Sequence, residues 1–219
     1  KTAYEIYQCD WSSDVCSSDL NGFIGRRLVA ALLQQGHDLR VLTRKSPWEF
    51  PPAVEVVVGD LTNANCPLEN FLRECDVLIH CAGEIRDASA MRLLHVEGTQ
   101  RLIQAVIDES KRTGKIIHWV QLSSVGAYGP APGKTDADRI VTEETPTQPV
   151  NEYEITKTIS DDLVIQASKN GQFTRSILRP SNVIGIQASD RFFPRLIKLI
   201  RRDRKSTRLN SSHTDISRM

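Results

Sequence analysis

The sequence predicts an α/β fold in which helices flank a doubly wound parallel sheet. Short apolar runs of strand length alternate along the chain with amphipathic stretches of helical length, a pattern typical of β/α units. Residues 116–122 form a largely apolar run, and a parallel strand that is buried on both faces has this composition. Six such units follow one another without an internal repeat, although the first lacks a recognisable strand.

The two ends of the chain differ in composition from the interior. Residues 10–20 and 203–213 are polar and rich in serine. One choice of codons for 10–20, reverse-complemented and read in a shifted frame, encodes 203–212. The same relation links residues 1–6 with 216–219, and the encoded DNA matches a common short-read sequencing adapter with its index.

We therefore expect residues 1–20 and 203–219 to be adapter-derived tails, which are left out of fold reasoning. Residues 21–202 are then the natural fragment. Two disordered polar tails are the alternative that composition allows, but they do not explain the complementarity. Ordinary genomic sequence continuing through those codons would contradict the adapter hypothesis.

Charge and cysteine content exclude several function classes. Lys and Arg total 28 against 27 Asp and Glu, so there is no electrostatic argument for nucleic acid or a membrane surface. No apolar run has the length of a membrane span, and the amino terminus lacks a signal-peptide core. Outside the tails the cysteines are Cys66, Cys75 and Cys81, with no CxxC pair to support a metal site or a disulfide framework. We expect a cytoplasmic protein with a small-molecule partner.

Residues 21–25 (NGFIG) open the first helix, which Gly36 ends before a strand at 39–43. Its apolar residues Leu28, Val29, Leu32 and Leu33 recur at helical spacing. The glycines are typical of the second half of a dinucleotide fingerprint, which brings backbone and a helix amino terminus to a pyrophosphate. The first fingerprint glycine is expected at position 19, where the chain has Asp. Because residues 12–19 are polar, we expect the first strand to be missing or replaced, and a missing strand would leave a central gap in the sheet.

Further candidate contacts follow the next strands. Arg44 ends the second strand and would accommodate a 2′-phosphate, which favours NADP over NAD; a solvated loop is the alternative. Residues 54–58 are the third strand, followed by Asp60 and Leu61. Asp60 either meets an adenine or caps the next turn. Residues 76–82 are the fourth strand and lead into Ala82 and Gly83.

Two reactive side chains in the fourth strand favour structural roles. His80 lies within the apolar run, which indicates a packed, hydrogen-bonded histidine rather than a base. Cys81 is expected to be a small core residue rather than a nucleophile. A long amphipathic helix then begins or is interrupted at Gly98.

The fifth strand leads into Ser123 and Ser124 at the edge where parallel sheets bind ligands. Residues 130–149 are rich in Pro, Asp, Thr and Gly, and a loop of this length indicates a lid or a substrate-contacting excursion. A helix from about 153 to 169 carries Tyr153 and Lys157 one turn apart on one face. A sixth strand (173–178) and the start of a helix (192–202) complete the chain.

The motifs NGFIG, GDL, HCAG, VEGT, SSVGAYG, YEITK and RPSNVIG occur in this order over essentially all of residues 21–202. They resemble the extended short-chain dehydrogenases/reductases, the NAD(P)-dependent epimerase/dehydratase family that acts largely on nucleotide sugars. The resemblance implies a partial Rossmann-type NAD(P)-binding domain, with most of the carboxyl-terminal substrate lobe truncated.

The resemblance also assigns roles to matching positions. Ser124, Tyr153 and Lys157 become the catalytic set, and Asn182 is placed to touch substrate. His95 stands where many relatives have Asn, and its hydrogen-bonding role is open. The cofactor contacts are Gly22, Phe23, Ile24 and Gly25 at the pyrophosphate, Asp60 and Leu61 at the adenine, Cys81, Ala82 and Gly83 along its middle, and Pro180 and Ser181 at the nicotinamide.

The expected chemistry is proton transfer by Tyr153. A phenol with a pKa of about 10 is a poor base at neutral pH. The Lys157 ammonium and the positive charge of an oxidised nicotinamide are expected to lower that pKa. Tyr153 then takes a proton from a substrate hydroxyl, or returns it during reduction, while hydride moves to or from nicotinamide. Ser124 holds the reacting oxygen in line.

Alternatives remain within this interpretation. Val125 and Gly126 stand where nucleotide-sugar dehydratases and decarboxylases have acidic residues, which leaves an epimerase or a carbonyl reductase. A non-catalytic dinucleotide-binding or assembly module is a second class, although such relatives typically lose the Tyr and Lys pair. An inactive fragment of the enzyme is a third. The resemblance is compatible with a homodimer of the parent enzyme.

Overall fold

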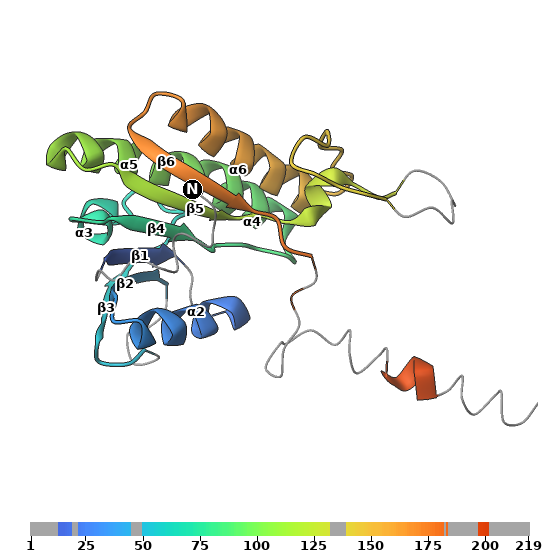
Figure 1. Cartoon of the computed structure of the whole chain (residues 1–219), viewed down its shortest axis with the longest axis horizontal. Helices are drawn as coiled ribbons and strands as arrows, with labels where there is room; N and C mark the ends of the chain where they lie inside the picture. The colour runs from blue at the N-terminus through green and yellow to red at the C-terminus, as the bar shows by residue number, and fades with distance from the viewer. Residues whose placement is uncertain are drawn as a thin grey trace, which may run out of the picture. The chain divides into compact units, whose positions relative to one another are not determined.

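The structure is a computed structural model that describes residues 13–18, 22–44, 50–131, 139–181, 183 and 197–201. Its first unit, Lys1–Val183, is built on a parallel sheet of six strands in the order β3-β2-β1-β4-β5-β6 (Figure 1). This confirms the predicted fold class. The strands are β1 (Asp14–Ser18), β2 (Asp38–Thr43), β3 (Val54–Val58), β4 (Val77–His80), β5 (Ile117–Leu122) and β6 (Phe173–Leu178).

Helices connect successive strands. They are α2 (Phe23–Gln34), α3 (Leu68–Leu72), α4 (Ala88–Arg92), the π-helix η2 (Leu93–Gly98), α5 (Thr99–Thr113), the 3₁₀ turn η3 (Val125–Tyr128) and α6 (Glu152–Ser168). The long amphipathic helix is therefore interrupted at Gly98, where π-helical geometry gives way to α5. At its other end α5 stops at Gly114, which adopts the left-handed conformation with φ of 73°.

β1 contradicts the expectation of a missing first strand and agrees with its alternative, a strand formed by replacement residues. It pairs in parallel with both β2 and β4, and Val15 lies opposite Leu39 on one side and Val77 on the other. The predicted central gap is therefore wrong. The strand lies inside the segment that the sequence assigned to an adapter-derived tail.

The polar residues of β1 form a strand because their neighbours satisfy them. Ser17 Oγ donates to the carbonyl of Ile79 at 2.9 Å, and Ser18 Oγ is hydrogen-bonded to His80 Nδ1 at 2.8 Å. Both serines are buried, and burying a hydroxyl costs free energy only when it lacks a partner. Tertiary context thus overrides the low strand propensity of serine and aspartate.

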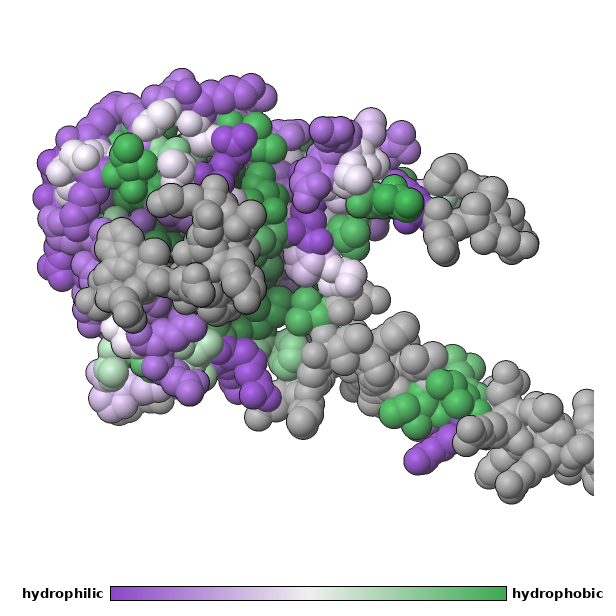
Figure 2. Space-filling model, in the orientation of Figure 1, coloured by the Kyte–Doolittle hydropathy of each residue, from purple (hydrophilic) through white to green (hydrophobic). Residues whose placement is uncertain are grey.

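Two apolar layers cover the two faces of the sheet. One contains Val15, Val41 and Val54 with Val29 of α2. The other contains alternate strand residues such as Leu78 and Trp119 together with side chains of α3, α5 and α6. In Figure 1 α2 lies on the opposite side of the strands from α5 and α6. Hydrophilic residues gather on the outer rim over these last two helices in Figure 2, as expected for helices with one buried face.

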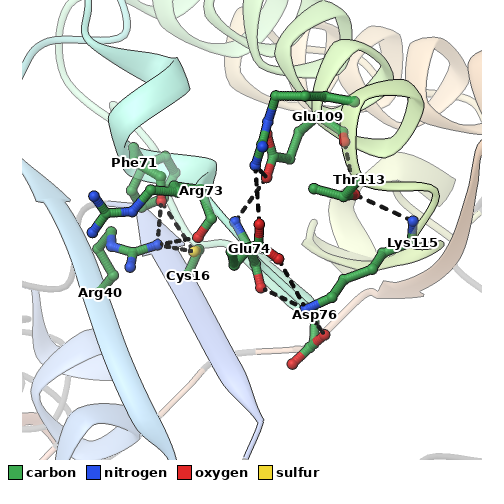
Figure 3. Close-up of polar contacts among 10 residues, drawn as sticks. Cys16, Arg40, Phe71, Arg73, Glu74, Asp76, Glu109, Thr113 and Lys115 are labelled. Carbon is green, nitrogen blue, oxygen red and sulfur yellow. Dashed lines mark hydrogen bonds and ion pairs between the residues drawn. The ribbon is translucent and has the colours of Figure 1, made fainter.

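Charged side chains secure the edge where the strands begin (Figure 3). Glu74, between α3 and β4, is a non-glycine residue with a positive φ of 57°, a conformation that side chains disfavour. Its backbone N–H donates to Glu109 Oε1 at 2.7 Å, and its carboxylate pairs with Arg112 at 3.3 Å and Lys115 at 3.4 Å. These contacts from α5 and the start of β5 hold the strained turn in place.

The second unit, Ile184–Met219, is described only at residues 197–201, which are helical. They agree with part of the helix expected at 192–202, and the rest of that prediction lies outside the described residues. In the expected loop at 130–149, the described residues contain neither helix nor strand. Arg139 ties this loop to the carbonyls of Tyr128 and Gly129 at 2.7 and 2.8 Å.

Candidate active site

A cleft open to solvent lies at the carboxyl ends of β1 to β4. Four predicted cofactor residues line it: Arg44, Asp60, Leu61 and Ala82. The lining residues that sequence reasoning missed are Ser18, Leu42, Thr43, Gly59 and Leu94. Ser18 was missed because no strand was expected there. Its position shortly before Gly22 and Gly25, which open the first helix, was the signal that could have found it.

The amino terminus of α2 is open to an anionic ligand. Gly22 precedes the helix in an extended conformation, no side chain caps the first turn, and that turn contains no acidic residue. A Cβ atom at Gly22 would have nothing within 4 Å, so the backbone there is accessible. Phe23 and Ile24 are half-buried and Gly25 is buried in the first turn. This 12-residue helix therefore offers free N–H groups of the kind that bind a pyrophosphate.

Asp60 caps a turn, which is one of its two predicted roles. Its Oδ1 accepts hydrogen bonds from the backbone N–H and the hydroxyl of Thr62, both at 2.8 Å. The carboxylate also lines the cleft. The turn role is confirmed, while the adenine contact stays a prediction.

His80 is a packed histidine, as predicted. It is 1% exposed, and its Nε2 lies 3.2 Å from Thr99 Oγ1. Burial, followed by the charge of Lys157, lowers the pKa of His80 to about 3. The network continues from Thr99 to Ser160 Oγ at 2.9 Å, so hydrogen-bonded side chains run from the cleft to α6. Cys81 is half-buried and packs against the α2 side of the core, in agreement with its predicted structural role.

The three predicted catalytic residues come from two adjacent elements. Ser124 is the N-cap of η3, and its Oγ accepts from the N–H of Gly126 at 3.1 Å. Tyr153 is the second residue of α6, and Lys157 follows one turn later. The turn η3 packs against α6. The turn that Ser124 caps therefore lies against the helix that carries Tyr153 and Lys157, and the joint catalytic role of the three residues stays a prediction.

The electrostatics of this pair differ from the expectation. Burial, with a contribution from the charge of Asp161, raises the pKa of Tyr153. Burial also lowers the pKa of Lys157 to about 8. The raised pKa of Tyr153 belongs to the protein alone, where burial of the ring and the Asp161 carboxylate set it. The expected depression, which also rests on the charge of an oxidised nicotinamide, stays a prediction.

Gly126 makes room for an acid that the sequence did not single out. A Cβ atom at Gly126 would lie 2.8 Å from Cγ and 3.1 Å from Oε1 of Glu154. Glu154 therefore fills the space beside η3, and its Oε2 accepts from the N–H of Val150 at 2.9 Å. This carboxylate secures the start of α6.

The end of β6 and the residues after it are hydrogen-bonded to the two neighbours of Ser124. The N–H of Ser123 donates to the carbonyl of Leu178 at 2.8 Å, and the N–H of Val125 donates to that of Pro180 at 3.0 Å. Pro180 and Ser181 thus lie beside the η3 turn, while their contact with nicotinamide stays a prediction. Asn182 lies outside the described residues.

His95 joins the two sides of the site. It is 1% exposed on η2, its Nδ1 lies 2.8 Å from Thr156 Oγ1, and its ring stands edge-on to Tyr153 with centroids 5.8 Å apart. On the other side, its Nε2 accepts from the N–H of Glu84 at 2.9 Å. The hydrogen-bonding role that the sequence left open is therefore defined.

Among the described residues, no group of three or more His, Cys, Asp or Glu side chains is placed to hold a metal ion. Over the same residues, no helix has the length and apolar character needed to cross a membrane.

Comparison with known proteins agrees with this geometry. The sequence profile of the NAD dependent epimerase/dehydratase family matches residues 20–215. A dTDP-6-deoxy-L-talose 4-dehydrogenase (NAD(P)(+)) of Kitasatospora kifunensis is 34% identical over 169 residues, which are 75% of this chain and 50% of the relative. A 4-hydroxy-2-methyl-3-oxo-4-farnesyl-3,4-dihydroquinoline-1-oxide ketoreductase of Stigmatella aurantiaca is 30% identical over 193 residues, or 84% of this chain and 54% of the relative.

A solved structure of a short-chain dehydrogenase/reductase superfamily protein from Agrobacterium tumefaciens, with bound NAD, is also similar. It has a TM-score of 0.64 and 26% identity, over 76% of this chain and 48% of that one. The chain spans about half the length of the curated relatives described above. The family profile, the parallel sheet and the Tyr153–Lys157 helix agree, and the chain belongs to the NAD dependent epimerase/dehydratase family.

Proposed function

We propose that this chain carries the dinucleotide-binding part and the proton-transfer residues of an NAD(P)-dependent epimerase or reductase. The substrate reacts at a hydroxyl or carbonyl group and is a nucleotide sugar or a molecule like one. The substrate class follows the Kitasatospora relative, whose name specifies a dTDP-sugar.

The observation that carries the proposal is the burial of Lys157. Its side chain is 3% exposed, and burial lowers the pKa of its ammonium to about 8, against the opposing effect of the Asp161 carboxylate. A charge buried in this way is costly to the fold, and such groups are concentrated at functional sites. In the proposed site this ammonium, one turn from Tyr153, donates hydrogen bonds to the ribose hydroxyls of the cofactor.

The side chains supply the proton chemistry. A nicotinamide, when bound, accepts or returns the hydride. Because its pKa is raised, Tyr153 keeps its proton and is set to donate it to a carbonyl oxygen. Ser124, half-buried at the base of α6, orients that oxygen by hydrogen bonding. In the oxidation direction, the positive charge of Lys157 favours the phenolate form of Tyr153. The phenolate then takes the proton of the substrate hydroxyl.

Arg44 supports a modest preference for NADP(H) over NAD(H). It is exposed at the end of β2 and lines the cleft, where an acidic residue would instead accept ribose hydroxyls. Arg44→Asp is expected to reverse the ratio of the two dissociation constants measured by titration. An unchanged ratio would contradict this assignment.

The cellular location and assembly remain proposals. None of the described cysteines, Cys16, Cys66, Cys75 and Cys81, forms a disulfide, which fits the reducing conditions of the cytoplasm. A homodimer of the parent enzyme stays a prediction of the family resemblance.

The test uses NADH and NADPH fluorescence titrations of the chain and of Lys157→Met. The substitution is expected to weaken binding on the order of tenfold or more, because hydrogen bonds to a charged donor are lost. Lys169→Met, at the exposed end of the same helix, is the matched control and should bind like the wild type. Equal binding by Lys157→Met would contradict the proposed site.

Turnover separates the enzyme from a binding module. Wild-type protein is incubated with dTDP-6-deoxy-L-talose or UDP-glucose and either oxidised cofactor, and products are followed by NMR. Oxidation or inversion at a sugar carbon supports the enzyme. Dinucleotide binding with no turnover of a panel of nucleotide sugars and ketones would favour the non-catalytic module or the inactive fragment.

A further inference from the structure

His95 lies where three parts of the candidate site meet. It belongs to the π-helical turn η2, whose geometry is uncommon and is found frequently at functional sites. The loop after β4, with Ala82 and Gly83, lies on one side. The first turns of α6, with Tyr153 and Lys157, lie on the other.

The hydrogen bonds of His95 fix its tautomer. A backbone N–H can only donate, so the 2.9 Å contact from Glu84 makes Nε2 an acceptor. The ring proton of the neutral imidazole is then on Nδ1, which donates to Thr156 Oγ1 at 2.8 Å. The Thr156 hydroxyl in turn donates to the carbonyl of Glu152 at 2.8 Å. The result is a directed chain from the cofactor loop into the helix between Tyr153 and Lys157.

We propose that His95, held as the Nδ1–H tautomer, is a positioning residue that locks the loop after β4 to the catalytic helix. The link makes the position of Ala82 and Gly83 depend on the position of Tyr153. Its effect on cofactor binding rests on the proposed function, in which these residues contact the cofactor. The edge-on packing of the two rings restrains Tyr153 as well.

The surroundings of His95 keep it neutral. Lys157 and Tyr153 face it from α6, Glu84 from the loop after β4, and His80 is close enough on β4 for their charges to interact. Burial, and then the positive charge of Lys157, lower the pKa of His95 to about 4, against a smaller opposing effect of Glu84. A proton on Nε2 would convert that acceptor into a donor and break the bond from Glu84.

The first measurement is the tautomer, by NMR of ¹⁵N-labelled imidazole rings at neutral pH. The expected spectrum shows a neutral His95 with its proton on Nδ1, and Thr156→Val should shift that signal. A predominant Nε2–H form or an imidazolium would overturn the proposal, whether or not a dinucleotide binds.

The second measurement uses two polar replacements that keep different halves of the link. In His95→Gln the side-chain oxygen can occupy the place of Nε2 and accept from Glu84. In His95→Asn the shorter amide can reach only the place of Nδ1, near Thr156. We expect His95→Gln to bind NADH within a few-fold of wild type, and His95→Asn and His95→Leu to bind on the order of tenfold more weakly.

The control is another histidine with two hydrogen-bond partners. His118 on β5 contacts Thr174 Oγ1 at 2.7 Å and Ser176 Oγ at 3.0 Å. It lies near the amino end of its strand, away from the ligand-binding edge. His118→Leu should leave NADH affinity unchanged. Equal binding of NADH by wild type, His95→Asn and His95→Leu would overturn the positioning role. Failure of the wild type to bind NADH would overturn the proposed function, and the tautomer measurement would then decide the proposal for His95.

Discussion

Asp161 on α6 and Arg179, the residue after β6, form a buried ion pair. Arg179 Nε donates to Asp161 Oδ2 at 3.0 Å, and the carboxylate is fully buried. Ser123, which precedes the catalytic serine, donates to the same oxygen at 2.7 Å. The pair therefore joins α6, the segment after β6 and the segment before η3.

Breaking this pair should destabilise the protein strongly. Arg179→Met leaves the fully buried carboxylate of Asp161 without its counter-charge, and losing one partner of a buried pair costs about 3–5 kcal/mol of unfolding free energy. Glu97→Gln breaks the exposed contact with Arg101 at 3.7 Å and should cost less than about 1 kcal/mol. Urea unfolding measures both changes, and similar losses in the two variants would contradict the structural role of the buried pair.

Lys157→Met should make the protein more stable while it weakens cofactor binding. The depression of the Lys157 pKa from 10.5 to about 8 corresponds to roughly 3 kcal/mol of destabilisation at neutral pH. The unfolded chain retains the proton between these values, so the penalty falls as the pH rises from about 8 towards 10.5.

The gain in melting temperature of Lys157→Met over wild type should therefore be largest below about pH 8 and shrink above it. Thermal melts across this range test the prediction, with Lys169→Met as the exposed control within about 0.5 kcal/mol of wild type. A lower melting temperature for Lys157→Met at neutral pH would show that the ammonium has a stabilising partner.

Two buried histidines should make the fold sensitive to mild acid. The pKa of His80 is lowered to about 3 and that of His95 to about 4, from 6.5. The unfolded chain takes up these protons first, so stability is fully present above about pH 6.5 and falls as the pH drops below it. Each histidine contributes up to about 1.4 kcal/mol per pH unit.

The window from about pH 6.5 to about pH 5 separates this effect from carboxylate titration. Urea unfolding at its two ends should show the loss for wild type and a smaller loss for His95→Gln. A flat profile for wild type would contradict the assignment of both histidines as neutral in the fold.

Residue patterning predicted most of the sheet and the helix that carries the site. The strands at 54–58 and 173–178 have the predicted bounds, because runs of apolar and β-branched residues between turn residues define them. The spacing of Tyr153 and Lys157 placed both on α6. Helical periodicity with glycine at the boundary placed α2.

The misses have physical causes. Ser17 and Ser18 form a strand because partners distant in sequence satisfy their hydroxyls, which no local propensity records. Burial of the ring, and then the charge of Asp161 two turns away on the same helix, raise the pKa of Tyr153. Only the packed structure shows both effects. The π-helical turn that aims His95 has no pattern distinct from an α-helix.

The most direct test of the account is the rate of substrate oxidation or reduction by Tyr153→Phe in the parent enzyme, measured beside its affinity for NADPH. Removal of a general acid/base should lower the rate on the order of a hundredfold or more. The ring and its packing on His95 are kept, so cofactor affinity should remain near that of wild type. A rate within a few-fold of wild type would show that Tyr153 is not the proton-transfer residue and that the site lies elsewhere.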